Sequence, residues 1–237
     1  MRRISDEYVL RQAQSKPNID ASYRCVFRCP QCVRQKTYTQ NQIKRSFDIG
    51  VNELQKILDF YNTMNFCGQI SDPIYHPQFL LFLKMCAEQN KFTKISTVGG
   101  GKDDNWWDEA FSYGVGKNAW YFGVDGIDEK SELYRVGSNF KEVWSRMLHG
   151  RDKGHNIVWQ YIIFDFNIDD MDKAVEIAKQ ENFSLLFINT NRPFNPDNPY
   201  LRKNVNYNIN GPQTKSPFKK QWYANITKQY HEWKKVH

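Results

Sequence analysis

The chain has 237 residues, of which 40% are hydrophobic and 25% charged, as is ordinary for a soluble globular protein with room for one full-sized domain. No apolar run is long enough to cross a bilayer, and the first ten residues, MRRISDEYVL, lack the apolar core of a signal peptide. We therefore expect a cytoplasmic protein with no membrane partner. The net charge of +7 allows a nucleic-acid partner, but the basic residues are scattered except near the carboxyl terminus.

Predicted strands and helices alternate along the chain. Short apolar or alternating runs predict strands, and apolar residues at helical spacing predict helices. The predicted strands are 18–24, 65–70, 92–98, 119–124, 157–166 and 184–189, and the predicted helices are 51–64, 78–89, 105–113, 139–152 and 169–180. This alternation predicts an α/β fold with a parallel sheet and right-handed crossovers. In such folds, ligands bind where the loops meet at the carboxyl ends of the strands.

The pattern changes after residue 192. Five prolines and many asparagines indicate an irregular segment, and residues 221–236 predict a terminal helix that packs on the body. We expect a domain at 1–192 and a short C-terminal extension at 193–237. The tail is rich in lysine interleaved with aromatic residues, which favours a solvated basic surface over an RNA-binding segment.

Three of the five cysteines lie within eight residues. Cys25, Cys29 and Cys32 have the spacing C-x3-C-x2-C directly after the first predicted strand. Three thiolates from one loop can hold three corners of an iron–sulfur cube, which leaves the fourth iron open for chemistry. Structural zinc is the alternative, but it needs four ligands in paired spacings, and no second pair is available nearby.

This motif and its position resemble those of the radical S-adenosylmethionine (SAM) superfamily. The resemblance covers residues 18–192 and is nearest to the branch of molybdenum-cofactor-type and SPASM-type enzymes and related phage-encoded proteins. It implies a partial (β/α)6 TIM-like barrel with one [4Fe-4S] cluster on the three cysteines, since residues 193–237 contain no cysteine. It also implies that the reduced cluster cleaves SAM to a 5′-deoxyadenosyl radical, with an electron donor such as flavodoxin or ferredoxin.

Three residues match family positions that hold the methionine part of SAM. Ser71 and Asp72, in Ile70-Ser71-Asp72-Pro73, resemble the Gly-Gly-Glu-Pro-like turn that receives the SAM amine. A carboxylate and strand-end carbonyls suit an ammonium group. Arg135 resembles a family arginine that binds the SAM carboxylate, for which guanidinium is a natural partner.

Three further residues match positions near the nucleoside. Thr97, in Thr97-Val98-Gly99, resembles the family's Thr-Asn-Gly, and Asp125, in Gly123-Val124-Asp125-Gly126, resembles Ser-x-Asp-Gly with glycine in place of serine. Both are expected near the ribose. Gln31 stands where the family often has an aromatic residue, so we expect its backbone to contact the adenine.

The predicted function is hydrogen abstraction from an unidentified substrate, with peptide and RNA both open because an uncovered barrel mouth suits a large molecule. The sequence leaves the reaction class open among oxidoreductases, transferases and lyases, and it identifies no catalytic residue. The alternative is a non-catalytic, metal-stabilised module that binds nucleic acid through the basic C-terminal tail.

Overall fold

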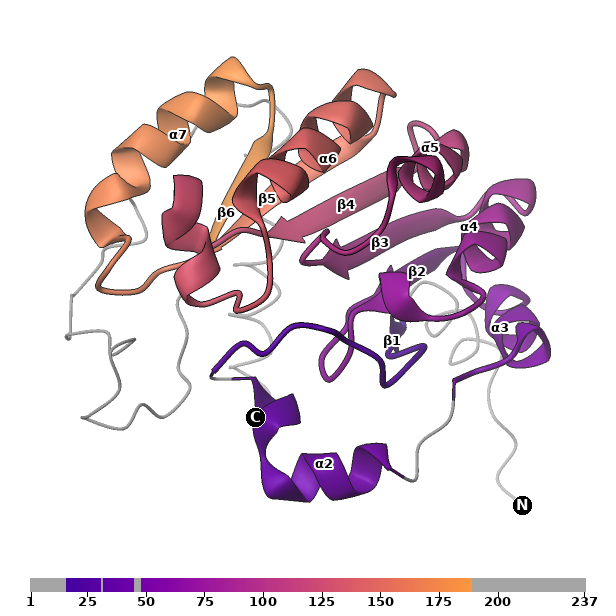
Figure 1. Ribbon diagram of the computed structural model, residues 1–237. Helices are drawn as coiled ribbons and strands as arrows, with labels where there is room; N and C mark the ends of the chain where they lie inside the picture. The colour runs from indigo at the N-terminus through magenta and orange to yellow at the C-terminus, as the bar shows by residue number, and fades with distance from the viewer. Residues whose placement is uncertain (1–15, 31, 45–47, 189–237) are drawn as a thin grey trace, which may run out of the picture.

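The computed structural model describes residues 16–30, 32–44 and 48–188. They contain one sheet of six parallel strands in the order β1-β2-β3-β4-β5-β6, and the sheet does not close into a full barrel (Figure 1). Each strand pairs with the next strand along the chain. The strands are β1 (Asn18–Ile19), β2 (Thr63–Phe66), β3 (Phe92–Thr97), β4 (Asn118–Gly123), β5 (Asn156–Ile162) and β6 (Ser184–Ile188).

A helix follows each of the strands from β2 to β5, and these helices lie with α3 on the outer face of the sheet (Figure 1). They are α3 (Val51–Leu58), α4 (Phe79–Glu88), α5 (Asp104–Ser112), α6 (Phe140–Asp152) and α7 (Met171–Gln180). Shorter elements stand in the connections: η1 (Val33–Gln35), α2 (Thr37–Ile43), η2 (Pro73–Tyr75), η3 (Asp128–Leu133) and η4 (Ile168–Asp170). This arrangement confirms the predicted α/β partial barrel.

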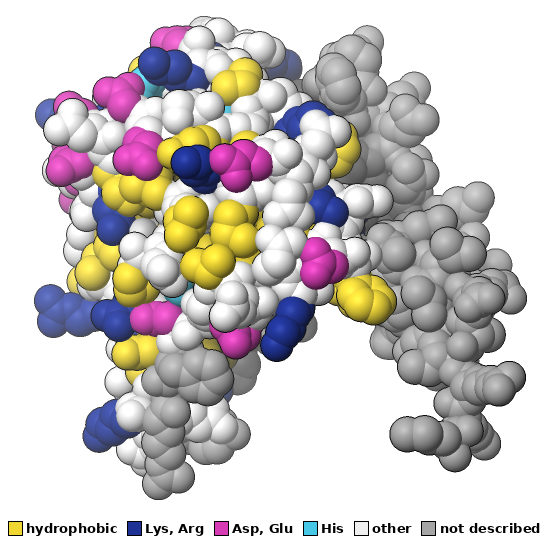
Figure 2. Space-filling model, turned by 90° about the vertical axis from the view of Figure 1, so that its right-hand side faces the viewer, with side chains coloured by type: hydrophobic (Ala, Val, Ile, Leu, Met, Phe, Trp, Pro, Cys, Tyr) yellow, Lys and Arg dark blue, Asp and Glu magenta, His cyan; other side chains and the backbone are white. Residues whose placement is uncertain are grey.

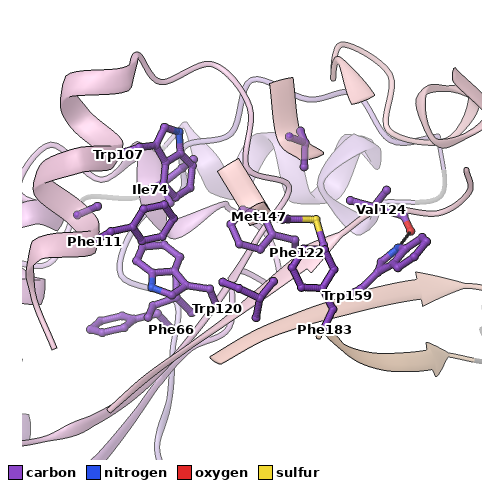
Figure 3. Close-up of a cluster of buried hydrophobic side chains, with 14 of the residues drawn as sticks. Phe66, Ile74, Trp107, Phe111, Trp120, Phe122, Val124, Met147, Trp159 and Phe183 are labelled. Atoms are coloured by element: carbon purple, nitrogen blue, oxygen red, sulfur yellow. Dashed lines mark hydrogen bonds between the residues drawn. The ribbon is translucent and has the colours of Figure 1, made fainter. Parts of the chain in front are cut away.

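The core lies between the sheet and the outer helices. Trp107 and Phe111 of α5 pack against Trp120 of β4, with ring centroids 5.1 to 5.5 Å apart (Figure 3). The indole nitrogen of Trp159 donates to the Val124 carbonyl at 2.7 Å, which satisfies the polar atom of a fully buried ring. Each such ring stabilises the fold by roughly 1.5–3 kcal/mol.

Four predicted elements differ from the observed ones by more than two residues at one end, and one of them is the strand predicted at 65–70, which is observed at Thr63–Phe66. The helix predicted at 51–64 ends at Leu58, and Thr63 and Met64 belong to β2, where Met64 pairs with Thr93. The first strand is only two residues long. The strand predicted at 157–166 ends at Ile162, because the side chain of Asn167 accepts from Phe164 N at 2.7 Å and turns the chain.

Helix α2 was not predicted, since Thr37–Ile43 lacks an apolar stripe. The boundary predicted at residue 192, the irregular segment and the terminal helix lie outside the described residues.

In the part of the chain that the structure describes, no helix is both long and apolar enough to cross a membrane. The face that carries α3, α4 and α5 shows hydrophobic side chains bordered by charges of both signs (Figure 2).

Candidate active site at the carboxyl edge of the sheet

The segment between β1 and α2 carries the three cysteines and crosses the carboxyl edge of the sheet (Figure 1). Backbone hydrogen bonds fix it to loops that follow two other strands: Asp72 N donates to Arg24 O at 2.9 Å, and Arg28 N donates to Val136 O at 3.0 Å. Within the segment, Cys32 N donates to Cys29 O at 3.0 Å. The fold therefore brings the cysteine loop to the edge at which ligands bind in parallel sheets.

All three thiols are free, and they differ in burial. Cys29 lies in a small apolar cluster with Phe27, Val98, Tyr134 and Phe164, whereas Cys25 and Cys32 are half-buried at its border. Burial, and to a lesser extent the charge of nearby Asp72, raise the pKa of Cys25 to about 12. Burial also raises the pKa of Cys29, although the charge of Arg135 opposes this effect. Thiolates here would need a positive partner, which the irons of a bound cluster supply.

Across the described ranges, no three His, Cys, Asp or Glu side chains are grouped so as to hold one metal ion. The ligands of a single zinc ion converge about 2.3 Å from it, whereas the thiolates of an iron–sulfur cube each bind a different iron. Three cysteine thiols on one partly enclosed loop are the donors that a [4Fe-4S] cluster takes from a protein.

The loop after β2 lies against the cysteine loop. Ser71 Oγ donates to Asp20 Oδ1 at 2.8 Å, beyond the end of β1. Arg34, two residues after the last cysteine, donates to Ile70 O at 2.9 Å and also to Tyr23 O. The strand-end carbonyl that we expected to receive an ammonium group therefore already accepts from a guanidinium in this structure.

Asp72 and Thr97 contact one another directly. Thr97 Oγ1 donates to Asp72 Oδ2 at 2.9 Å, and Val98 N donates to the same oxygen at 2.8 Å. The other carboxylate oxygen accepts from Ile74 N. Burial raises the pKa of Asp72 to about 6 despite these donors. The two side chains join the loops after β2 and β3.

Asp125 and Arg135 form an ion pair in the loop after β4. Arg135 Nε lies 2.7 Å from Asp125 Oδ2, and Ile162 N donates to Asp125 Oδ1 at 2.7 Å. Asn167 Nδ2 donates to the carbonyls of Asp125 and Ile162, so the ends of β4 and β5 are joined. Burial lowers the pKa of Arg135, but Asp125 and Cys29 raise it more, and the guanidinium stays charged.

A cavity of about 330 Å³ opens beside the first cysteine. Tyr75 of η2 lines this cavity, and its hydroxyl donates to Gly100 O at 2.6 Å. The lining residues are Tyr23, Arg24, Cys25, Val26, Arg34 and Tyr75. The sequence analysis did not identify Arg34 or Tyr75, although a basic residue two positions after a cysteine motif is a usable signal.

The sequence also missed a lysine on the inner face of the sheet. Lys94 lies at the same level as Asn65 and Ala119 on the neighbouring strands, and its ammonium nitrogen is 4.2 Å from the centre of the Tyr121 ring. Burial lowers its pKa. The polar alternation of β3, with Lys94 and Ser96 between buried residues, was the available signal.

The structure thus brings eight of the nine predicted site residues to one edge of the sheet. They are Cys25, Cys29, Cys32, Ser71, Asp72, Thr97, Asp125 and Arg135, and Gln31 lies outside the described residues. The side chains of Ser71, Asp72, Thr97 and Asp125 are engaged in hydrogen bonds within the protein.

Comparison with known proteins finds no match among protein-family models and none among curated proteins. Solved structures do match. SuiB of Streptococcus suis bound to S-adenosylmethionine has a TM-score of 0.57 at 11% identity, over 78% of this chain and 42% of SuiB. The protein anSMEcpe with bound AdoMet and a peptide named Kp18Cys has a TM-score of 0.59 at 18% identity, over 77% and 54% of the two chains.

A third match is methylornithine synthase (PylB), with a TM-score of 0.54 at 12% identity over 78% of this chain and 60% of PylB. This chain therefore spans about half the length of these three solved structures, from 42% to 60%. These proteins are radical SAM enzymes. The described part of the chain has the fold of radical SAM enzymes.

Proposed function

We propose that this protein is a radical SAM enzyme in which Cys25, Cys29 and Cys32 hold a [4Fe-4S] cluster. The observation that carries the proposal is the placement of three free cysteines, on one partly enclosed loop, at the carboxyl edge of an open six-stranded sheet. When bound and reduced, the cluster supplies one electron that cleaves SAM to methionine and a 5′-deoxyadenosyl radical.

Residues in the loops beside the cysteine loop support a binding site for SAM. Ser71 and Asp72 lie in the loop that is hydrogen-bonded to the cysteine loop, and we assign them to the methionine end. Asp72 is anionic above pH 6 and favours an ammonium group nearby. Arg135 carries the positive charge that suits the SAM carboxylate.

We assign Thr97 and Asp125 to the ribose side of the site. Because their side chains are engaged within the protein, their role is to fix the loops whose backbone would face the ligand. Gln31 is assigned to the adenine through its backbone. The aromatic ring of Tyr75 and the stem of Arg34 are further walls of the cavity.

For the substrate, we favour a peptide over RNA. SuiB is solved with its precursor peptide SuiA, and anSMEcpe is solved with a bound peptide. The inner face of the sheet is partly polar, because Lys94 of β3 lies over the ring of Tyr121 of β4. Both strands lead to the edge of the sheet that carries the cysteine loop. The reduction requires a one-electron donor, for which we propose a protein such as flavodoxin or ferredoxin.

The test is anaerobic. The protein is reconstituted with iron and sulfide, reduced with dithionite and incubated with SAM, and 5′-deoxyadenosine is measured by mass spectrometry. We expect product from the wild type and none from Cys29→Ala. Cys86→Ala is the matched control, because Cys86 is a buried cysteine of α4 outside the site and its variant should still make product. A full cluster that yields no 5′-deoxyadenosine would contradict the proposal, and a colourless protein with bound zinc would favour the binding module.

A further inference from the structure

Arg135 lies between an acidic side chain and a cysteine thiol. Its Nε donates to Asp125 Oδ2 at 2.7 Å, while its Nη1 points to Cys29 Sγ at 4.0 Å. The side chain is 17% exposed and that of Asp125 is fully buried. The guanidinium also covers the ring of Tyr134, with its central carbon 5.4 Å from the ring centre. Its orientation toward the cysteine is therefore fixed from two sides.

A glycine at the end of β4 makes room for this orientation. A Cβ atom added to Gly123 would lie 2.8 Å from Arg135 Nη2 and 3.0 Å from its Cζ. Both distances are shorter than normal contacts, so any larger residue would displace the guanidinium. Gly123 stands where the related motif has serine, and the structure gives a physical reason for the difference: the arginine occupies the space that a serine side chain would need.

A fixed positive charge beside a cysteine ligand changes the energetics of a cluster. One electron from a reductant such as dithionite converts the cluster from the 2+ to the 1+ state and adds one negative charge to it. A cation and an N–H donor at a ligating sulfur stabilise the more negative state, and hydrogen bonds to the sulfurs are among the features that set cluster potentials. The buried position of the pair limits screening by water.

We propose that Arg135 is a positioning residue of the cluster, whose guanidinium donates to the Cys29 thiolate and raises the reduction potential, with Asp125 orienting it and Gly123 leaving it space. The inference rests on the proposed function, because it requires the cluster on Cys25, Cys29 and Cys32. It is separate from any contact of Arg135 with the SAM carboxylate, since Nη2 lies over Gly123 and is not the nitrogen directed at Cys29.

The experiment is a redox titration of the reconstituted protein without SAM, followed by electron paramagnetic resonance. For Arg135→Gln we expect a tenfold lower ratio of reduced to oxidised cluster at a given potential, which is a shift of about 59 mV to more negative values for one electron. Gly123→Ala keeps every charge but displaces the guanidinium, and it should shift the potential in the same direction. Arg151→Gln removes one positive charge at the end of α6, where Arg151 pairs with Glu181, and it should leave the potential unchanged.

The outcomes separate this inference from the proposed function. If the wild type assembles no [4Fe-4S] cluster, the proposed function fails. If the cluster assembles and both variants titrate like the wild type, the role of Arg135 at Cys29 is refuted even where SAM affinity falls. If Arg135→Gln does not retain a cluster because the buried Asp125 loses the positive charge of Arg135, the titration of Gly123→Ala tests the inference by itself.

Discussion

Replacing Asp72 by asparagine should remove the part of the pH dependence of the folding stability that comes from this one carboxyl group. Asp72 is 3% exposed, and burial raises its pKa from 3.8 to about 6 in the folded protein. The folded state therefore binds a proton more tightly than the unfolded state. The resulting stability is fully present below pH 3.8 and is lost as the pH rises through 6. A shift of about two units corresponds to about 3 kcal/mol.

The assay is denaturant unfolding of the wild type and Asp72→Asn, both in the cluster-free form, at intervals from pH 3.5 to 8. The free energy of unfolding of the wild type, minus that of the variant, should fall by about 3 kcal/mol over this range. The difference isolates one carboxyl group from all the others. A difference that stays level, or that rises with pH, would show that the donors from Thr97 and Val98 outweigh burial and would refute the reasoning.

Three substitutions should lower the free energy of unfolding. Trp159→Phe removes the indole N–H that donates to the Val124 carbonyl, and should lower the free energy of unfolding by about 1–3 kcal/mol in denaturant unfolding. An unchanged free energy of unfolding would show that this hydrogen bond does not stabilise the fold. Gly99→Ala places a Cβ 2.6 Å from the Phe122 ring at a φ of +90°, and should cost about 1–3 kcal/mol in the same assay. Asn167→Ala removes three side-chain hydrogen bonds at the ends of β4 and β5, and should cost about 2–4 kcal/mol in the free energy of unfolding. Amide exchange at Ile162 should become faster, and an unchanged exchange rate would refute this prediction.

The sequence predicted the order of elements well because each outer helix and each strand has its own apolar periodicity. It failed at boundaries that depend on tertiary contacts. Met64 reads as the end of a helix by spacing, but it pairs with Thr93 in the sheet. Asn167 reads as a turn residue, whereas in the structure it joins two strands through three hydrogen bonds.

At the candidate site too, local features could be predicted from the sequence and tertiary contacts could not. The cysteine motif and the strand-end positions are local features, and they could be recognised from the sequence. The contact of Arg135 with Cys29 joins residues 106 positions apart, and the space over Gly123 exists only once that arginine is in place. Lys94 was missed because a lysine in a strand is ordinarily a solvated residue, and only the pairing with neighbouring strands places it on the inner face.

The backbone bonds that hold the cysteine loop have a consequence for the order of assembly. The loop precedes most of the sheet in the chain, yet its contacts at Arg24 and Arg28 are made by Asp72 and Val136. A growing chain must reach about residue 136 before these partners exist, so the thiols are synthesised long before their surroundings form. The cysteine loop therefore cannot complete these contacts before about residue 136 has been synthesised, and a cluster bound on the three cysteines would add a further link between the loops after β1, β2 and β4.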